Sequence, residues 1–208
     1  MAIQNAAKVS QKGGVLLELL ISSFLSIGVI GSVMVLLVSS LKVGTNRAQK
    51  LMLAESVASV VQQIKQDIQR AGYGAGKGVR ATLAGMGDTV YADKDILGYR
   101  YWVQEEHAYR HVVFKWQQTA SGQLLICEKM SLSALTLEQA KRSGVLGNCF
   151  NVFDPRQIRV SEFEVAVTPY SESSMSRRFI SMSLSSHLVS NPKIEYSVNA
   201  VFFIRNGE

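Results

Sequence analysis

Lys12-Gly13-Gly14-Val15-Leu16-Leu17-Glu18 leads directly into Leu19–Leu41, an apolar run of 23 residues without a charged side chain. A helix of that length spans about 34 Å, enough to cross a hydrocarbon core of about 30 Å. Glu18 therefore lies at the edge of a membrane-length segment, where a carboxylate is costly unless another group pairs with it. The sequence predicts a membrane-spanning helix whose charge needs a partner.

Two other interpretations of this segment stay open. A secretory signal peptide has an apolar core of roughly 7–15 residues followed by a small-residue cleavage site, which Ser39-Ser40-Leu41-Lys42 imitates. The core helix of a globular domain is the other interpretation, and it is weaker at this length. Lysine and arginine flank the run on both sides, so their distribution does not set its orientation.

The helical period continues beyond the apolar run. Six apolar residues recur at steps of four, three, four, four and three, which places them on one stripe: Leu53, Val57, Val60, Ile64, Ile68 and Ala71. Glutamine, lysine and arginine occupy the opposite face. We therefore expect one long helix with two parts. Residues 14–42 form a membrane or filament-core part, and residues 43–71 form an amphipathic part whose stripe needs a protein surface.

Four glycines within Gly72–Gly78 end this helix, because glycine lowers helix propensity and allows left-handed backbone. Their spacing fits neither of the common nucleotide-binding glycine motifs, and they follow a helix instead of a strand. We expect a glycine-rich loop over residues 72–95.

From residue 96 to residue 208 the apolar period is two, as in β-strands. Ile194–Ile204 alternates without a break, and the alternation in Ile158–Val167 slips between Val160 and Phe163, as a β-bulge makes it do. The other expected strands are Leu97–Val103, Arg110–Trp116, Leu124–Glu128 and Arg178–Leu184. About six strands in succession, with a helical or irregular excursion around Leu135–Ser143, favour an α+β fold in which the helix stripe covers an antiparallel sheet.

Cys127 and Cys149 are the two cysteines of the chain. In a domain exported to an oxidising compartment such a pair predicts one disulfide, and two buried free thiols are the alternative. Neither cysteine has the spacing of a zinc ligand. The three histidines form no recognisable catalytic arrangement, so we expect no enzyme activity, catalytic residue, metal or cofactor. The net charge of +6 is too modest and dispersed to support nucleic-acid binding.

The Lys-Gly leader, the spacing from glycine to glutamate and the apolar run resemble the processing site of type IV prepilins and type II secretion pseudopilins. The stretch Ile64–Tyr73, which reads Ile-Lys-Gln-Asp-Ile-Gln-Arg-Ala-Gly-Tyr, is similar to the helix end of J-type minor pilins and pseudopilins. That group includes the prepilin peptidase-dependent protein B family. These motifs lie within residues 1–75, and the sheet half resembles the family only in outline.

The resemblance implies roles for three residues. Prepilin peptidase, an intramembrane aspartyl protease, would cut between Gly13 and Gly14, remove residues 1–13 as a leader, and methylate the new amine of Gly14. Glu18 would then pair with the terminal amine of a neighbouring subunit in the filament. A bulky apolar residue usually follows the cut in this family, but Gly14 stands there. Cutting after Gly14 would instead start the chain at Val15.

The resemblance also implies a function and a location. We expect a minor pilin with one helix in the bacterial inner membrane and residues 96–208 in the periplasm. It would join other minor pilins and the major pilin to prime or cap a type IV pilus. Its further partners would be prepilin peptidase, the inner-membrane pilus assembly platform and, before assembly, membrane lipid. A J-class pseudopilin of a type II secretion system is one alternative, and a bitopic membrane protein with a periplasmic binding or catalytic domain is another.

Overall fold

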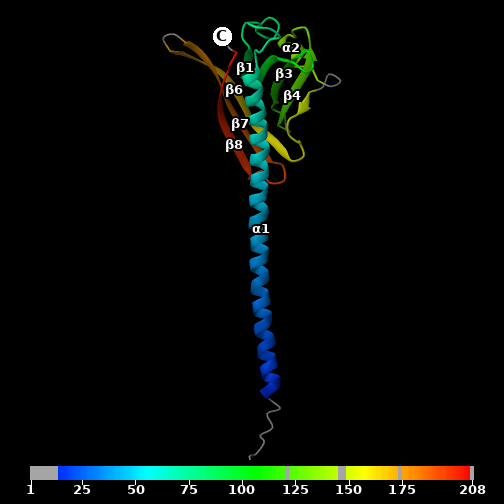
Figure 1. Ribbon diagram of the computed structural model, residues 1–208. Coiled ribbons are helices and arrows are strands. Elements are labelled where there is room, and N and C mark those ends of the chain that lie inside the picture. Colours follow the sequence, from blue (N-terminus) through cyan, green and yellow to red (C-terminus); the bar gives the residue numbers. More distant parts are fainter. Residues whose placement is uncertain (1–13, 120–121, 145–148, 173–174, 207–208) are drawn as a thin grey trace, which may run out of the picture. The chain divides into compact units, whose positions relative to one another are not determined.

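The computed structural model describes residues 14–119, 122–144, 149–172 and 175–206. The chain divides into two units, residues 1–48 and 49–208, and the second unit contains the β-sheet. The elements follow one another along the chain as α1 (Gly14–Arg70), β1 (Val90–Lys94), β2 (Ile96–Val103), β3 (Ala108–Gln117), β4 (Gln123–Ser131), α2 (Leu137–Ala140), β5 (Phe150–Asn151), β6 (Ile158–Glu172), β7 (Met175–Leu188) and β8 (Glu195–Phe203) (Figure 1).

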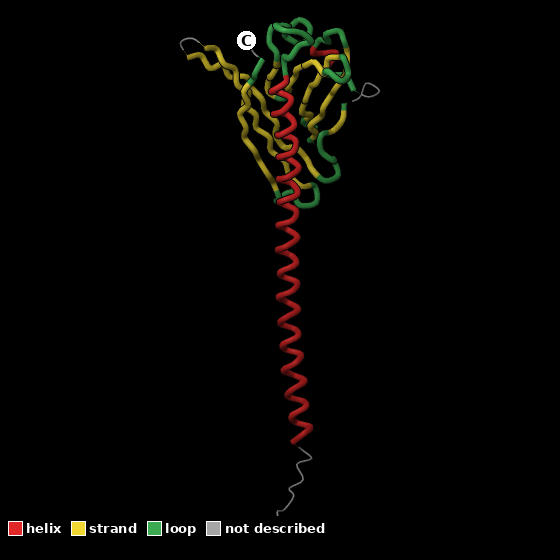
Figure 2. Tube along the Cα trace, viewed as in Figure 1, coloured by secondary structure: helices red, strands yellow, loops and turns green. Residues whose placement is uncertain are grey.

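The strands of the described chain form one sheet in the order β5-β4-β3-β2-β1-β6-β7-β8 (Figure 2). Every neighbouring pair in this order is antiparallel. The sheet curls around the second part of α1, and the main hydrophobic core fills the space between them. The α+β fold expected from the sequence, a long helix packed on an antiparallel sheet, is confirmed.

The predicted apolar stripe is the buried face of α1. Its six residues, from Leu53 to Ala71, are each at most 7% exposed. They join one core with residues from both halves of the sheet, among them Tyr99 of β2 and Phe163 of β6. Burying a side chain of the size of leucine, isoleucine or valine stabilises the fold by roughly 1.5–3 kcal/mol before entropic costs. The stripe is therefore a large part of what holds α1 on the sheet.

The end of α1 is set by Gly72. This residue has a φ angle of +83°, and a Cβ atom there would meet Thr89 Cγ2 at 2.6 Å and the Asn206 carbonyl oxygen at 2.9 Å. The Nδ2 amide of Asn206 donates a hydrogen bond to the Ala71 carbonyl at 3.0 Å. Because the last carbonyls of a helix have no partner within the helix, this contact from the C-terminal segment satisfies one of them.

Two halves of the sheet meet at a narrow seam. β1 and β6 pair only through Asp93–Lys94 and Val165–Ala166. The turn between β3 and β4 adds a second connection, because the Val160 amide of β6 donates to the Gly122 carbonyl at 2.9 Å. A Cβ atom at Gly122 would lie 2.4 Å from the Val160 carbonyl oxygen, so this close approach requires glycine.

The sheet face that points away from α1 is covered over one half only. Over β2–β4 it carries a second, smaller core of Leu83, Val113, Cys127 and Ala140, against which residues of the segments before β1 and around α2 pack. Over β6–β8 the same face carries exposed or half-exposed side chains, most of them polar, including Glu162, Glu164, Ser183 and Asn199. The two halves therefore differ in how much of the sheet the chain itself covers.

Two strands are missing from the sequence prediction. The expected loop over residues 72–95 is wrong at its end, because β1 begins at Val90. The two-residue strand β5 was not expected either. Such short segments show too little alternation to be recognised, and they form because a longer strand offers them hydrogen-bond partners. The predicted bulge is confirmed, since the register between β6 and β7 shifts between Val160 and Glu162.

Candidate functional site

The residues assigned to processing and assembly lie at the start of α1. Gly13 and the rest of the leader, residues 1–13, lie outside the described residues. Gly14 begins α1, and Glu18 is exposed about one turn further along. The Glu18 backbone carbonyl accepts a hydrogen bond from Ser22 Oγ at 2.7 Å. Within residues 14–119 and the later described ranges, the Glu18 carboxylate has neither an ion pair nor a hydrogen bond.

The first part of α1 is apolar on every side. Its large apolar side chains between Val15 and Val43 are 50% to 80% exposed, with Phe24 the most exposed of them. By length and composition this helix is able to cross a membrane. Exposing apolar surface to water costs about 25 cal/mol per Å², so residues 14–42 require lipid or other apolar helices around them.

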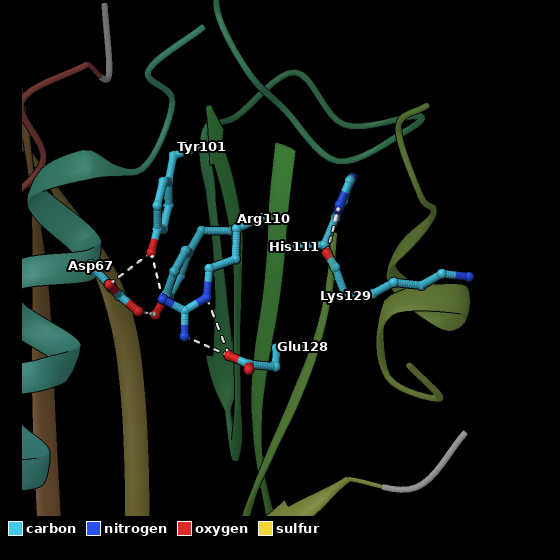
Figure 3. Close-up of polar contacts among 7 residues, drawn as sticks. Asp67, Tyr101, Arg110, His111, Glu128 and Lys129 are labelled. Carbon is cyan, nitrogen blue, oxygen red and sulfur yellow. Dashed lines mark hydrogen bonds and ion pairs between the residues drawn. The ribbon is translucent and has the colours of Figure 1, made fainter. Parts of the chain in front are cut away.

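The second part of α1 carries a buried carboxylate. Asp67 is 5% exposed, and it accepts hydrogen bonds from the hydroxyl groups of Tyr99 at 2.9 Å and Tyr101 at 3.0 Å (Figure 3). Both tyrosines belong to β2, two residues apart, so they lie on the same face of the sheet. These two bonds fix the end of α1 to the strand beneath it.

Two further charged residues extend this group. Arg110 of β3 donates from Nη1 to the Tyr101 hydroxyl oxygen at 3.0 Å, and from Nε to Glu128 of β4 at 3.2 Å. We call Asp67, Tyr99, Tyr101, Arg110 and Glu128 the anchor cluster. Its side-chain hydrogen bonds connect α1, β2, β3 and β4 (Figure 3).

The protonation states suit a fixed contact. Burial, reinforced by the charge of Asp67, raises the pKa of Tyr101, and it raises the pKa of Tyr99 well above its usual value. Burial by itself lowers the pKa of Arg110, but the hydrogen bond with Glu128 and the nearby acidic groups of Tyr101, Glu128 and Asp67 together outweigh this effect, and the net shift is upward. At neutral pH both tyrosines are therefore protonated donors and Arg110 is a cation. Each donor is already directed at an acceptor within the cluster, which is what a tie between helix and sheet requires.

The anchor cluster was not expected from the sequence, although the sequence contains one signal of it. Asp67 lies three residues after Ile64 and seven after Val60, so it is on the apolar stripe. A carboxylate on such a stripe must find hydrogen-bond donors when the stripe is buried. The sequence does not reveal which strand lies under the end of α1, so Tyr99 and Tyr101 could not be assigned as those donors.

Cys127 and Cys149 are joined by a disulfide in the structure, with their Cα atoms 4.3 Å apart. Cys127 comes directly before Glu128 in β4, and neighbouring residues of a strand point to opposite faces, so Cys127 lies on the other face of the sheet from the anchor cluster. There it belongs to the second core, beside Val113 and Ala140. The bridge ties the segment that follows α2 to the sheet.

His111 is fully buried on that same face of the sheet. Its Nδ1 atom is hydrogen-bonded to the Lys129 carbonyl at 3.3 Å, and its Nε2 atom accepts a hydrogen bond from the Leu135 amide at 3.2 Å. Both ring nitrogens therefore have partners in the chain, and the imidazole is neutral in this arrangement. Among the residues that the structure describes, no group of histidine, cysteine, aspartate and glutamate is placed to hold a metal ion.

The first part of α1 is apolar on every side, and the second part buries one apolar stripe against an antiparallel sheet. This combination defines a pilin-like subunit. The sequence model of one such family, described as prepilin peptidase-dependent protein B, matches residues 46–204, and the chain belongs to this family. No curated protein and no solved structure matches the chain. The family match begins after Glu18, so it is independent of the Gly13–Glu18 motif, and it includes the whole anchor cluster.

Proposed function

We propose that this protein is a minor pilin, a subunit that joins other minor pilins and the major pilin and primes or caps a type IV pilus. The observation that carries the proposal is the division of α1 into a part that is apolar on every side and a part that is buried along one stripe. Residues 14–42 can leave lipid only if other apolar helices replace it. A helical filament of such subunits supplies those helices.

In this proposal prepilin peptidase cuts between Gly13 and Gly14 and methylates the new amine of Gly14. Residues 14–42 first lie in the lipid of the bacterial inner membrane, with the sheet in the periplasm. The inner-membrane assembly platform then moves the chain into the filament, where the Glu18 carboxylate pairs with the terminal amine of a neighbouring subunit. Because each charge compensates the other in an apolar environment, the pair sets the register between adjacent helices.

The intact mass of the protein, purified from a strain with active prepilin peptidase, tests this function. We expect the loss of residues 1–13 and the gain of one methyl group. Gly13→Asp should leave the chain at full length, because a charged side chain at the cut prevents close approach of the backbone to the protease. Gly14→Ala, which adds one methyl group after the cut, is the matched control and should still be processed.

Other measured masses would point to a different cut or a different class of protein. A mature chain that starts at Val15 moves the cut by one residue, and equal processing of Gly13→Asp and the parent contradicts the proposal. An intact N-terminus beginning at Met1 or Ala2 would indicate a bitopic membrane protein. Because a J-class pseudopilin would be cut in the same way, sheared surface pili should be probed for the processed chain. Its presence there supports the minor pilin.

A further inference from the structure

β8 is the last strand of the sheet, with β7 on one side of it and no strand of the described residues on the other. It pairs with β7 over all nine of its residues without a register shift. The other edge strand, β5, has only two residues, Phe150–Asn151, and is followed by a chain segment that bonds back to β4. The long open edge of this sheet is therefore β8.

The hydrogen-bond pattern tells which backbone groups of β8 point outward. The Ile204 amide donates to Arg178 and the Leu188 amide donates to Ile194, so even-numbered residues of this segment bond to β7. In an antiparallel pair, bonded and non-bonded residues alternate. The backbone groups of Ser197, Asn199 and Val201 therefore face away from β7, and no hydrogen bond to any described residue is found for them.

β8 lacks the features that usually protect an edge strand. Such strands are commonly blunted by lysine, proline or a bulge. β8 contains no lysine and no proline, its register is regular, and its one charged residue is Glu195 at the start. Val201 is 68% exposed and Phe203 is 42% exposed. An edge of this kind is ready to accept another strand.

The side chains of β8 define what would fit beside it. Toward α1, the half-buried Tyr196, Val198 and Ala200 pack against the main core and remain open on their outer side. On the other face Ser197 and Asn199 are exposed and polar, and Val201 and Phe203 are exposed and apolar. The row of outward amides and carbonyls is matched only by another extended backbone. An occupant therefore alternates, with apolar side chains toward α1 and, on the opposite face, polar ones beside Ser197 and Asn199 and apolar ones beside Val201 and Phe203.

We propose that β8 is a strand-addition site, at which an extended segment of another subunit of the same filament continues the sheet. This inference rests on the proposed function, since it takes the occupant from the filament. A second copy of the chain is a poor occupant. Antiparallel pairing of two β8 strands relates the copies by a two-fold axis that reverses the direction of residues 49–70. Two subunits whose residues 49–70 run in the same direction along a filament therefore cannot form that pair.

Amide hydrogen exchange of the full-length processed chain tests the proposal. It is measured by mass spectrometry on β8 peptides, once for the chain purified from the membrane in detergent and once for the chain in sheared filaments. In detergent the amides of Ser197, Asn199 and Val201 should exchange fast, whereas those of Val198 and Ala200 are protected by bonds to β7. In the filament the outward amides should slow by about tenfold or more, and the inward amides should change little.

A pair of substitutions at one position gives a second readout. Val201→Pro removes an outward amide without breaking a bond to β7, and edge strands tolerate proline at such positions. Val201→Ala is the matched control, because it removes most of the exposed side chain and keeps the amide. We expect the fraction of Val201→Pro in filaments to fall about five- to tenfold, with Val201→Ala near the parent.

The outcomes separate this inference from the proposed function. If the processed chain enters filaments but its outward amides exchange as fast as in detergent, strand addition is wrong and the minor-pilin function stands. If the chain keeps its leader and never enters filaments, both are wrong. Slow exchange of the outward amides already in detergent, together with a dimer mass, would make a second copy the occupant and overturn the inference.

Discussion

Each part of α1 carries a carboxylate on an otherwise apolar surface, and the two carboxylates have opposite environments. Asp67 is 5% exposed and bound by two tyrosine hydroxyls of its own chain. Glu18 is exposed, and within the described chain nothing pairs with it. A carboxylate taken out of water needs donors or a cation nearby. Asp67 obtains them when the chain folds, whereas in the proposed function Glu18 obtains them when chains assemble.

This contrast can be broken at Glu18, where we expect the largest effect. Glu18→Ala should abolish incorporation into filaments, because removing one member of a buried pair typically costs about 3–5 kcal/mol. Insertion into the membrane, leader cleavage and the fold of the sheet should be unchanged, since Glu18 lies outside residues 49–208, the unit that contains the sheet. Immunoblots of sheared filaments and of membranes measure the two pools separately.

The matched control for Glu18→Ala is Glu55→Ala, which removes an exposed carboxylate from the second part of the same helix. This variant should enter filaments like the parent. If Glu18→Ala enters filaments as well as Glu55→Ala does, the pairing mechanism is wrong even though the family assignment stands.

Removing the disulfide tests whether it stabilises the domain independently of the anchor cluster. Replacing Cys127 and Cys149 together by serine should lower the free energy of unfolding by about 3 kcal/mol, mainly through the freedom gained by the unfolded chain. Urea unfolding of the full chain in detergent, followed by tryptophan fluorescence, measures this, because Trp102 and Trp116 lie on β2 and β3.

The same cysteines report on the compartment. In protein taken from the envelope without reduction, neither thiol should react with an alkylating reagent, and both should react after reduction. Two thiols that alkylate freely in native exported protein would contradict the bridge and the periplasmic location. The anchor cluster lies on the other face of the sheet, so Tyr99 and Tyr101 should keep their contact with Asp67 in the serine variant.

Periodicity explains which parts of the fold could be predicted. The stripe from Leu53 to Ala71 and the alternation of Ile194–Ile204 are local patterns, and both have the predicted burial or pairing. β1 and β5 are too short to show a pattern. The placement of β1 between β2 and β6 depends on packing over the whole sheet, which no local pattern encodes.

The residues of the candidate site also differ in whether the sequence alone could predict them. The roles of Gly13, Gly14 and Glu18 follow from a linear motif, so the sequence alone is enough to propose them. The anchor cluster joins Asp67 to residues 32 and 34 positions away, and the hydrogen bonds form only when β2 lies under α1. The open edge at β8 likewise appears only once the strand order is known.

Asp67 gives the counterpart to the Glu18 experiment. Asp67→Asn keeps the shape and one acceptor oxygen but replaces charged hydrogen bonds by neutral ones, which should lower the free energy of unfolding by about 1–2 kcal/mol. Urea unfolding measures it, and Gln66→Asn on the exposed face is the matched control, expected within about 0.5 kcal/mol of the parent. An unchanged stability in Asp67→Asn would mean that the anchor cluster does not hold α1 to the sheet.

The smallest expected effect is a change in how stability depends on acidic pH. It concerns His111, a buried side chain that is neutral. Burial lowers the pKa of His111, and the nearby cations Arg100 and Lys129 add to this shift. The unfolded chain, with an ordinary histidine pKa of about 6.5, therefore takes up this proton more readily than the folded chain. The contribution of His111 to stability is complete above that pH and is lost as the pH falls below it.

His111→Asn should be less stable than the parent at pH 7.5 and should lose less stability between pH 7.5 and 5.5. His107→Asn, at an exposed turn, is the control and should keep the slope of the parent. Equal slopes in both variants would show that His111 does not couple acid to unfolding.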